Sequence, residues 1–274
     1  MRHAICAAGA SLLGVTFLVS CSSPNKSLGP RPRGEGALRF AIASGAAPHT
    51  AGFSAAALQS HARCTPTVTT AGKATVITCG GDVLTLNKVS LVLREIELEP
   101  TGVVTCDATV GNDDCEEVET GPMRFDVPLG VNTVAHVVTV SGLPPGTYDE
   151  LEFEIHRPSP ARDAAFVQSH PDLAGISIRA EGTFSRGGAA ARNFVYTSDL
   201  EEEEEEDMLL TVPQSGSVGV TLQIDVAGWF MADGGLVDPE MANDQGEYES
   251  DVRHNIRESV KAFQDNDQDG VEDD

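Results

Sequence analysis

From residue 37 onward, the chain consists of short apolar runs rich in Val, Ile, Leu and Thr, separated by breaks rich in Gly, Pro, Asn and Asp. Runs of this kind are typical of β-strands joined by turns, and many of them in succession indicate an all-β domain. We therefore expect an all-β fold, a β-sandwich. The expected strands cover the two arms around Gly72 and residues 37–43, 83–100, 123–129, 135–142, 147–158, 175–184, 192–199, 208–213 and 218–226.

Residues 147–158 carry the clearest alternation. After one offset following Tyr148, the apolar residues Leu151, Phe153 and Ile155 alternate with acidic residues. This period of two predicts a strand with one face in the core and the other in water.

Two stretches have helical features. Residues 161–175 predict one short crossover helix before Pro171. Near the C-terminus, residues 251–264 predict an amphipathic helix with Asp251 as its N-cap, and we expect its apolar stripe to dock on the same chain. The stripe is spaced by four, four and three residues: Val252, Ile256, Val260 and Phe263.

The chain stops on the ten residues DNDQDGVEDD. Alternate acids in a tight loop turn toward one cation, and Gly270 allows the positive φ that the turn needs. A helix followed by this loop resembles the first half of an EF-hand, and the spacing is also similar to the loops of thrombospondin type 3 repeats and dockerins. The expected calcium ligands are Asp265, Asp267, Asp269, the Val271 carbonyl and Asp273.

The loop departs from the EF-hand because the chain ends at its tenth position, before the bidentate Glu, and because no exit helix follows. We therefore expect weak calcium binding, with a dissociation constant on the order of 10⁻⁴ to 10⁻³ M. The alternative is that these ten residues are a solvated acidic tail.

The N-terminus has the features of an export signal, with Arg2 followed by an apolar run from Ala4 to Val19. The run ends in the residues LVSC, which resemble the lipobox of bacterial lipoproteins. The resemblance implies that Cys21 is lipidated, that the chain is anchored to the cell envelope by lipid, and that it is sorted to the outer membrane. The alternatives are an ordinary signal peptide or an uncleaved anchor.

Four cysteines remain after the signal peptide and the lipidated residue, which is an even number in an oxidising compartment. Cys64 and Cys79 flank a predicted hairpin that turns at Ala71-Gly72, so we expect them to pair. Cys106 and Cys115 then pair across an acidic loop. A metal site is the alternative, although no C-x-x-C spacing occurs.

The formal net charge is −24, with 18 basic and 42 acidic residues. This balance argues against nucleic acid as a partner, because phosphates need Lys and Arg to neutralise them. The densest acidic run, residues 201–207, predicts a solvated loop, since six consecutive glutamates repel one another.

Residues 140–155 contain the turn LPPGTY before a half-buried strand. This turn resembles the closing strand pair of prealbumin-like sandwiches. Together with LTLNKVSLVLREIEL, FDVPLG and the lipobox, it makes the chain similar to uncharacterised bacterial lipoproteins with that fold. The resemblance implies the architecture over residues 37–230 and leaves the function open.

These patterns divide the chain into a signal peptide (1–20), a flexible tether (21–36), a sandwich (37–232), a linker (233–250) and a terminal helix with its loop (251–274).

The sequence motifs of serine hydrolases, P-loop proteins and dinucleotide-binding proteins are missing, so we expect no enzyme. The histidines do not recur at the spacing of a zinc helix, and a strand His such as His136 or His156 is more often a surface or satisfied core residue.

The expected function is a monomeric, non-enzymatic binding or structural module of the cell envelope, with a glycan or protein partner. A carbohydrate-binding or adhesive protein is the alternative, for which Trp229 and Phe230 would form an exposed platform rather than pack in the core. A hydrolase without a recognisable motif is the third hypothesis.

Overall fold

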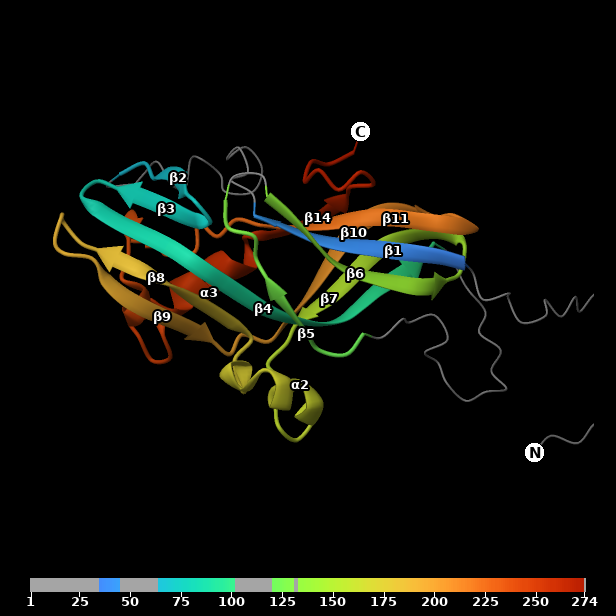
Figure 1. Cartoon of the computed structure of the whole chain (residues 1–274), viewed down its shortest axis with the longest axis horizontal. Helices are drawn as coiled ribbons and strands as arrows, with labels where there is room; N and C mark the ends of the chain where they lie inside the picture. The colour runs from blue at the N-terminus through green and yellow to red at the C-terminus, as the bar shows by residue number, and fades with distance from the viewer. Residues whose placement is uncertain (1–34, 45–63, 102–119, 131–132, 274) are drawn as a thin grey trace, which may run out of the picture. The chain divides into compact units, whose positions relative to one another are not determined.

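The computed structural model describes residues 35–44, 64–101, 120–130 and 133–273. The all-β prediction is confirmed, and the strands form a sandwich of sheets (Figure 1). The strands are β1 (Glu35–Ser44), β2 (Thr67–Ala71), β3 (Ala74–Cys79), β4 (Asp82–Pro100), β5 (Met123–Asp126), β6 (Thr133–Leu143), β7 (Gly146–Ile155), β8 (Ile178–Ser185), β9 (Arg192–Ser198), β10 (Glu202–Val212), β11 (Ser215–Ile224), β12 (Met231–Ala232), β13 (Gly235–Leu236) and β14 (Val260–Gln264).

One sheet has four strands in the order β14-β11-β1-β6, with β1 and β11 parallel. The larger sheet has the order β10-β7-β4-β3-β2, and β5, β8 and β9 extend it. Strand β4 is its long central element. Its first half pairs with β3 and β8 and its second half with β5 and β7, so one continuous strand joins both parts of the sheet.

The chain crosses between the two sheets at short proline turns. The LPPGTY turn joins β6 of the four-stranded sheet to β7 of the larger one, and its Tyr148 hydroxyl donates to the Pro144 carbonyl at 2.7 Å. The predicted strand pair is therefore wrong, because β6 and β7 lie in different sheets. Pro213 lies in the equivalent turn between β10 and β11.

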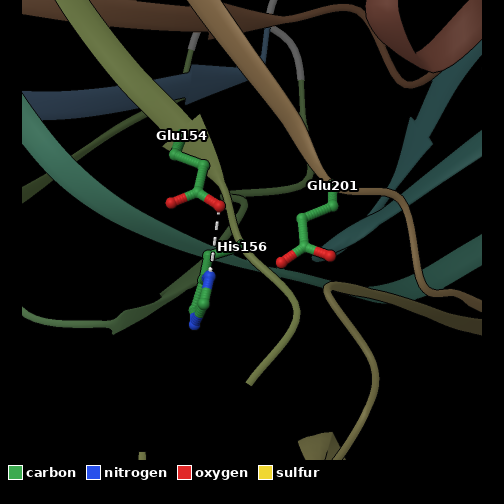
Figure 2. Close-up of side chains that lie close together, drawn as sticks. All are labelled: Glu154, His156 and Glu201. Atoms are coloured by element: carbon green, nitrogen blue, oxygen red, sulfur yellow. Dashed lines mark hydrogen bonds and ion pairs between the residues drawn. The ribbon is translucent and has the colours of Figure 1, made fainter. Parts of the chain in front are cut away.

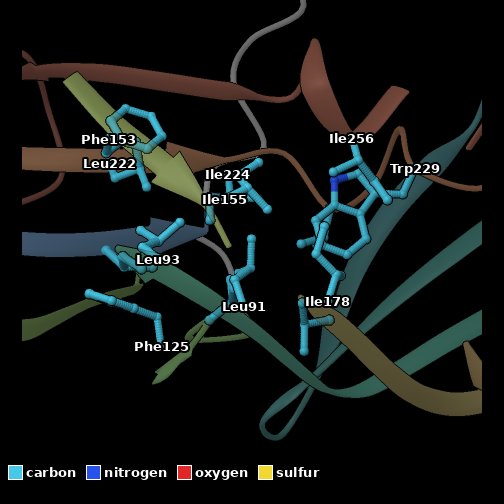
Figure 3. Close-up of a cluster of buried hydrophobic side chains, with 14 of the residues drawn as sticks. Leu91, Leu93, Phe125, Phe153, Ile155, Ile178, Leu222, Ile224, Trp229 and Ile256 are labelled. Atoms are coloured by element: carbon cyan, nitrogen blue, oxygen red, sulfur yellow. The ribbon is translucent and has the colours of Figure 1, made fainter. Parts of the chain in front are cut away.

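The inward faces of both sheets share one hydrophobic core (Figure 3). Phe40 from β1 packs edge-to-face on Phe125 from β5, with ring centroids 6.1 Å apart. Strand β7 buries Leu151, Phe153 and Ile155, as its alternation predicts. An aromatic pair in edge-to-face contact contributes about 0.5–1.5 kcal/mol beyond its buried area.

The described residues include the helix α2 (Ala164–Ser169) and the 3₁₀ turns η1 (Pro171–Leu173) and η2 (Pro239–Ala242). The short helix predicted before Pro171 is confirmed as α2. A further helix, α3 (Glu249–Arg257), lies near the C-terminus. None of the helices in the described part of the chain is long and apolar enough to cross a membrane.

The predicted helix over residues 251–264 is wrong in its second half. Helix α3 ends at Arg257, and Val260–Gln264 form strand β14, which pairs antiparallel with β11. Asp251 lies inside the helix, and Tyr248 occupies the N-cap position. The expected docking is observed, because Val252 and Ile256 are fully buried in the core of the same chain.

Ser259 explains why the helix stops. Its hydroxyl donates to the Ile256 carbonyl at 2.6 Å and accepts from the Trp229 indole nitrogen at 2.8 Å. The Ser259 hydroxyl thus satisfies a backbone carbonyl of the last helical turn by a hydrogen bond. The chain beyond Ser259 then pairs with β11. The spacing of the apolar residues from Val252 to Phe263 fits either one helix or a helix followed by a strand. Pairing with β11 selects the second arrangement.

Cys64 and Cys79 form a disulfide bond, with Cα atoms 5.5 Å apart. The hairpin beside them turns at Gly72 and Lys73, one residue later than predicted, and Gly72 has a φ of +65°. Cys21, Cys106 and Cys115 lie outside the described residues, as do the signal peptide and most of the tether.

Replacing Ser259 with Ala should destabilise the fold by about 1–3 kcal/mol, because the buried indole N–H of Trp229 loses its acceptor. Trp229 is the single tryptophan, so its fluorescence during urea denaturation reports this site directly. The exposed Ser250→Ala is the matched control. Equal urea midpoints for Ser259→Ala and Ser250→Ala would show that the Trp229 hydrogen bond is dispensable.

Candidate functional site

The terminal acidic loop follows β14 directly, so a strand and not a helix leads into it. The EF-hand-like order of helix and loop is therefore wrong. The loop nevertheless gathers Asp265, Asp267 and Asp269, with one carboxylate oxygen from each lying within 4.8 Å of the others. Gly270 has a φ of +84°, as the sequence predicts.

Asp265 is the anchor of this loop, because its side chain is fully buried. One carboxylate oxygen accepts from the Asp269 backbone N–H at 3.1 Å. The other accepts from the Thr221 hydroxyl at 2.7 Å and from the Gly270 N–H at 3.0 Å. These bonds hold the carboxylate in a fixed orientation at the start of the loop.

Strands β1 and β11 of the four-stranded sheet hold the loop by hydrogen bonds. The Asp265 N–H donates to the Gly219 carbonyl at 3.0 Å, and a Cβ at Gly219 would overlap the Asp265 carbonyl oxygen. Arg39 on β1 donates to the Asn266 carbonyl and, at 3.4 Å, to the Gln268 side chain. The end of the chain is thus bound to β1 and β11.

The other two expected ligand residues, Asp273 and Val271, make further contacts within the loop. The Asp273 carboxylate accepts from the backbone and side-chain nitrogens of Asn266, both at 2.8 Å. Val271 is exposed, and its N–H donates to the Asp269 carboxylate at 2.8 Å. The carboxylates that lie together are those of Asp265, Asp267 and Asp269.

This spacing suits calcium. Oxygens on opposite sides of a calcium ion, at 2.3–2.6 Å from it, are about 4.6–5.2 Å apart, and neighbouring ligands are closer. Three oxygens within 4.8 Å of one another fit around such an ion without a large movement of the loop. Oxygen-only ligands of this kind suit calcium or magnesium better than a transition metal.

The six-glutamate run is a strand rather than the predicted loop. Glu202–Asp207 belong to β10, which pairs with β7 at the edge of the larger sheet. On the outer face, Glu203 and Glu205 lie opposite Glu154 and Glu152. On the inner face, alternate glutamates of β10 lie opposite buried residues of β7, and inward-pointing charges of this kind protect an edge strand against further pairing.

Crowded carboxylates on these strands hold protons at unusually high pH. A hydrogen bond to Glu203, together with burial, raises the pKa of Glu152 to about 8. Burial and the Glu202 and Glu206 carboxylates raise the pKa of Glu204 to about 7. Arg94 of β4 offsets part of the charge by pairing with Glu154 at 2.7 Å.

A second mixed cluster lies at the end of β7 (Figure 2). His156 is fully buried, and its Nδ1 lies 3.3 Å from Glu154 Oε1 while its Nε2 lies 3.1 Å from Asp163 Oδ2. Glu154, His156 and Glu201 each offer an atom within 4.8 Å of the others. The sequence expectation of a satisfied strand histidine missed this cluster, because Glu201 joins it only through the pairing of β10 with β7.

Trp229 does not form the exposed platform that the carbohydrate-binding alternative requires. It is fully buried, and Phe230 beside it packs edge-to-face on Tyr196 at 5.2 Å between ring centroids. The expected packing of these two residues in the core is therefore confirmed. The His136 side chain lies outside the described residues.

No protein-family model matches the chain, and no curated protein or solved structure is significantly similar to it.

Acidification from about pH 8 to about pH 5 should stabilise the fold. The folded state raises the pKa of Glu204 to about 7 from its ordinary value of 4.5, so it binds a proton that the unfolded chain releases. The resulting stability is fully present below the unfolded pKa and is lost as the pH rises through the folded pKa. After allowance for solvent screening, the contribution is about 1–2 kcal/mol.

Urea denaturation across this pH range, on the wild type and on Glu204→Gln, measures the effect. Glu204→Gln should flatten the pH dependence, whereas the exposed Glu247→Gln should leave it unchanged. Identical slopes for Glu204→Gln and wild type would contradict the assignment.

Proposed function

We propose that this protein is a lipid-anchored, non-enzymatic binding or structural module of the bacterial cell envelope whose C-terminal loop binds calcium. The observation that supports the calcium part most strongly is the buried, pre-oriented Asp265 carboxylate beside Asp267 and Asp269. The lipobox-like residues ending in Cys21 support the anchor.

Calcium would act on the loop by neutralising three carboxylates that are otherwise held close together. The same loop is bonded to β11 through Gly219 and Thr221 and to β1 through Arg39. Calcium binding would therefore strengthen the attachment of the chain end to the four-stranded sheet. Extracellular calcium modules of this strength bind with dissociation constants of about 10⁻⁴ to 10⁻³ M.

Calcium should raise the melting temperature of the full chain. A ligand at ten times its dissociation constant adds about 1.4 kcal/mol to the free energy of unfolding. Asp267→Asn removes an exposed ligand without disturbing the buried Asp265, so it should abolish the calcium-dependent shift.

The control is Asp244→Asn, which removes the same charge from an exposed position outside the loop and should keep the shift. Thermal melts with EDTA and with millimolar calcium make the comparison. A wild-type melting temperature that is the same in both conditions would reject the calcium site.

Cys21→Ser should prevent lipidation and release the protein from membranes. In a bacterial host fed with labelled palmitate, the wild type should carry label and fractionate with membranes, whereas Cys21→Ser should carry none. Cys64→Ser, which removes a cysteine of the Cys64–Cys79 disulfide and leaves Cys21 intact, is the control, and it should remain labelled. Equal labelling of wild type and Cys21→Ser would overturn the lipid anchor.

A further inference from the structure

The cluster around His156 shares no residue with the terminal loop and has different chemistry. It combines one imidazole with two carboxylates, and mixed nitrogen and oxygen ligands suit zinc and its neighbours better than calcium. Each of its residues comes from a defined place in the larger sheet: Glu154 from β7, His156 just after it, and Glu201 just before β10.

Strand pairing explains how the three residues meet. Glu202 lies opposite Ile155 in the antiparallel ladder, and Glu203 lies opposite Glu154. Continuing this register by one residue brings Glu201 opposite His156. Figure 2 shows the carboxylates of Glu154 and Glu201 on the side of the ring that carries Nδ1.

The distances suit a tetrahedral ion. Two ligands at 2.0–2.1 Å from such an ion are about 3.3–3.4 Å apart. His156 Nδ1 and Glu154 Oε1 are already 3.3 Å apart. The Glu201 atom lies within 4.8 Å of both, and this side chain is exposed, so a small rotation can bring it closer.

Asp163 holds the imidazole in the orientation that a metal ligand needs. Its Oδ2 lies 3.1 Å from His156 Nε2 and also accepts the Ser159 backbone N–H at 2.8 Å. With Nε2–H donating to Asp163, Nδ1 is the nitrogen that can coordinate a metal, which would take the place of a proton shared with Glu154 Oε1. A carboxylate behind a metal-binding histidine is the usual arrangement in such sites, because it fixes the tautomer and the ring.

Arginines neighbour both glutamates and would compete with a metal. Arg94 binds Glu154 through Oε2, which leaves Oε1 facing the imidazole. Arg162 and Arg157 lie 3.2 and 3.6 Å from the Glu201 carboxylate, and all three of these side chains are solvent-accessible. Ion pairs as exposed as those of Glu201 with the two arginines contribute little free energy, so a metal ion can displace the arginines from Glu201.

The two glutamates of the cluster face a pocket, whereas the buried His156 does not line it. Glu154 and Glu201 line this pocket of about 320 Å³ together with Arg94, Glu95, Glu152, Glu202 and Glu203. The pocket has room for the water that would complete a four-coordinate ion, and its carboxylates raise the local concentration of cations.

We propose that His156 Nδ1, Glu154 and Glu201 form a binding site for a divalent transition-metal ion of the zinc class, with Asp163 as the residue that positions the imidazole. The site is independent of the terminal loop, so it stands whether or not calcium binds there.

Titration calorimetry of the full chain with Zn²⁺, in the presence of excess calcium to occupy the terminal loop, tests the site. Glu201→Gln removes a ligand on the surface, and we expect at least a tenfold loss of affinity for one Zn²⁺. Glu205→Gln removes the same charge from the outer face of β10, away from the three ligands, and should change the affinity less than twofold.

Titration with Co²⁺ reports the coordination directly. A four-coordinate site should give a strong visible absorption band in the wild type and in Glu205→Gln, and Glu201→Gln should lose or shift it. The proposal is overturned if wild type binds no Zn²⁺, or if Glu201→Gln and Glu205→Gln weaken binding equally, which would mean that the acidic face attracts ions without coordinating them.

Discussion

Burial of the two inward sheet faces against each other holds this protein together, and the last strand of the chain is part of that packing. Phe40 and Leu222 of the four-stranded sheet meet Phe125 and Phe153 of the larger one in a single core. Strand β14 completes the four-stranded sheet along β11. The start of the terminal loop is therefore held in a fixed position, because the loop begins where β14 ends.

The same core makes the acidic face of the larger sheet possible. Like charges directly opposite each other on neighbouring strands destabilise a sheet. Here the opposing residues on the other face include Phe153 and Leu151, which are fully buried. Burial of these side chains outweighs the repulsion, and raised pKa values at Glu152 and Glu204 reduce the charge that remains.

The sequence predicts an element correctly where its pattern of apolar residues is compatible with only one kind of secondary structure. The alternation in β7 fits only a strand, and its buried residues are those expected. The apolar spacing from Val252 to Phe263 fits a helix, but Ser259 ends the helix through contacts with Trp229 and Ile256 that no local pattern reveals. The glutamate run was expected to be a loop from its charge, yet pairing with β7 makes it a strand.

The two side-chain clusters differ in the same way. Asp265, Asp267 and Asp269 are close in sequence, so their spacing and Gly270 were sufficient to predict that they converge. The His156 cluster needs Glu201, which lies 45 positions away in the chain and approaches only through the register of two strands. A lone histidine beside a strand carries no signal for such a cluster, and only the fold reveals it.

Amide hydrogen exchange of β14, measured with and without calcium, tests the central claim that the chain end is a strand of the core sheet closed by a metal-binding loop. The account predicts that the amides of Val260–Gln264 that pair with β11 are protected, and that calcium slows their exchange further while leaving β9 unchanged. Exchange of these amides at the rate of an unfolded chain, or protection that does not respond to calcium, would contradict it.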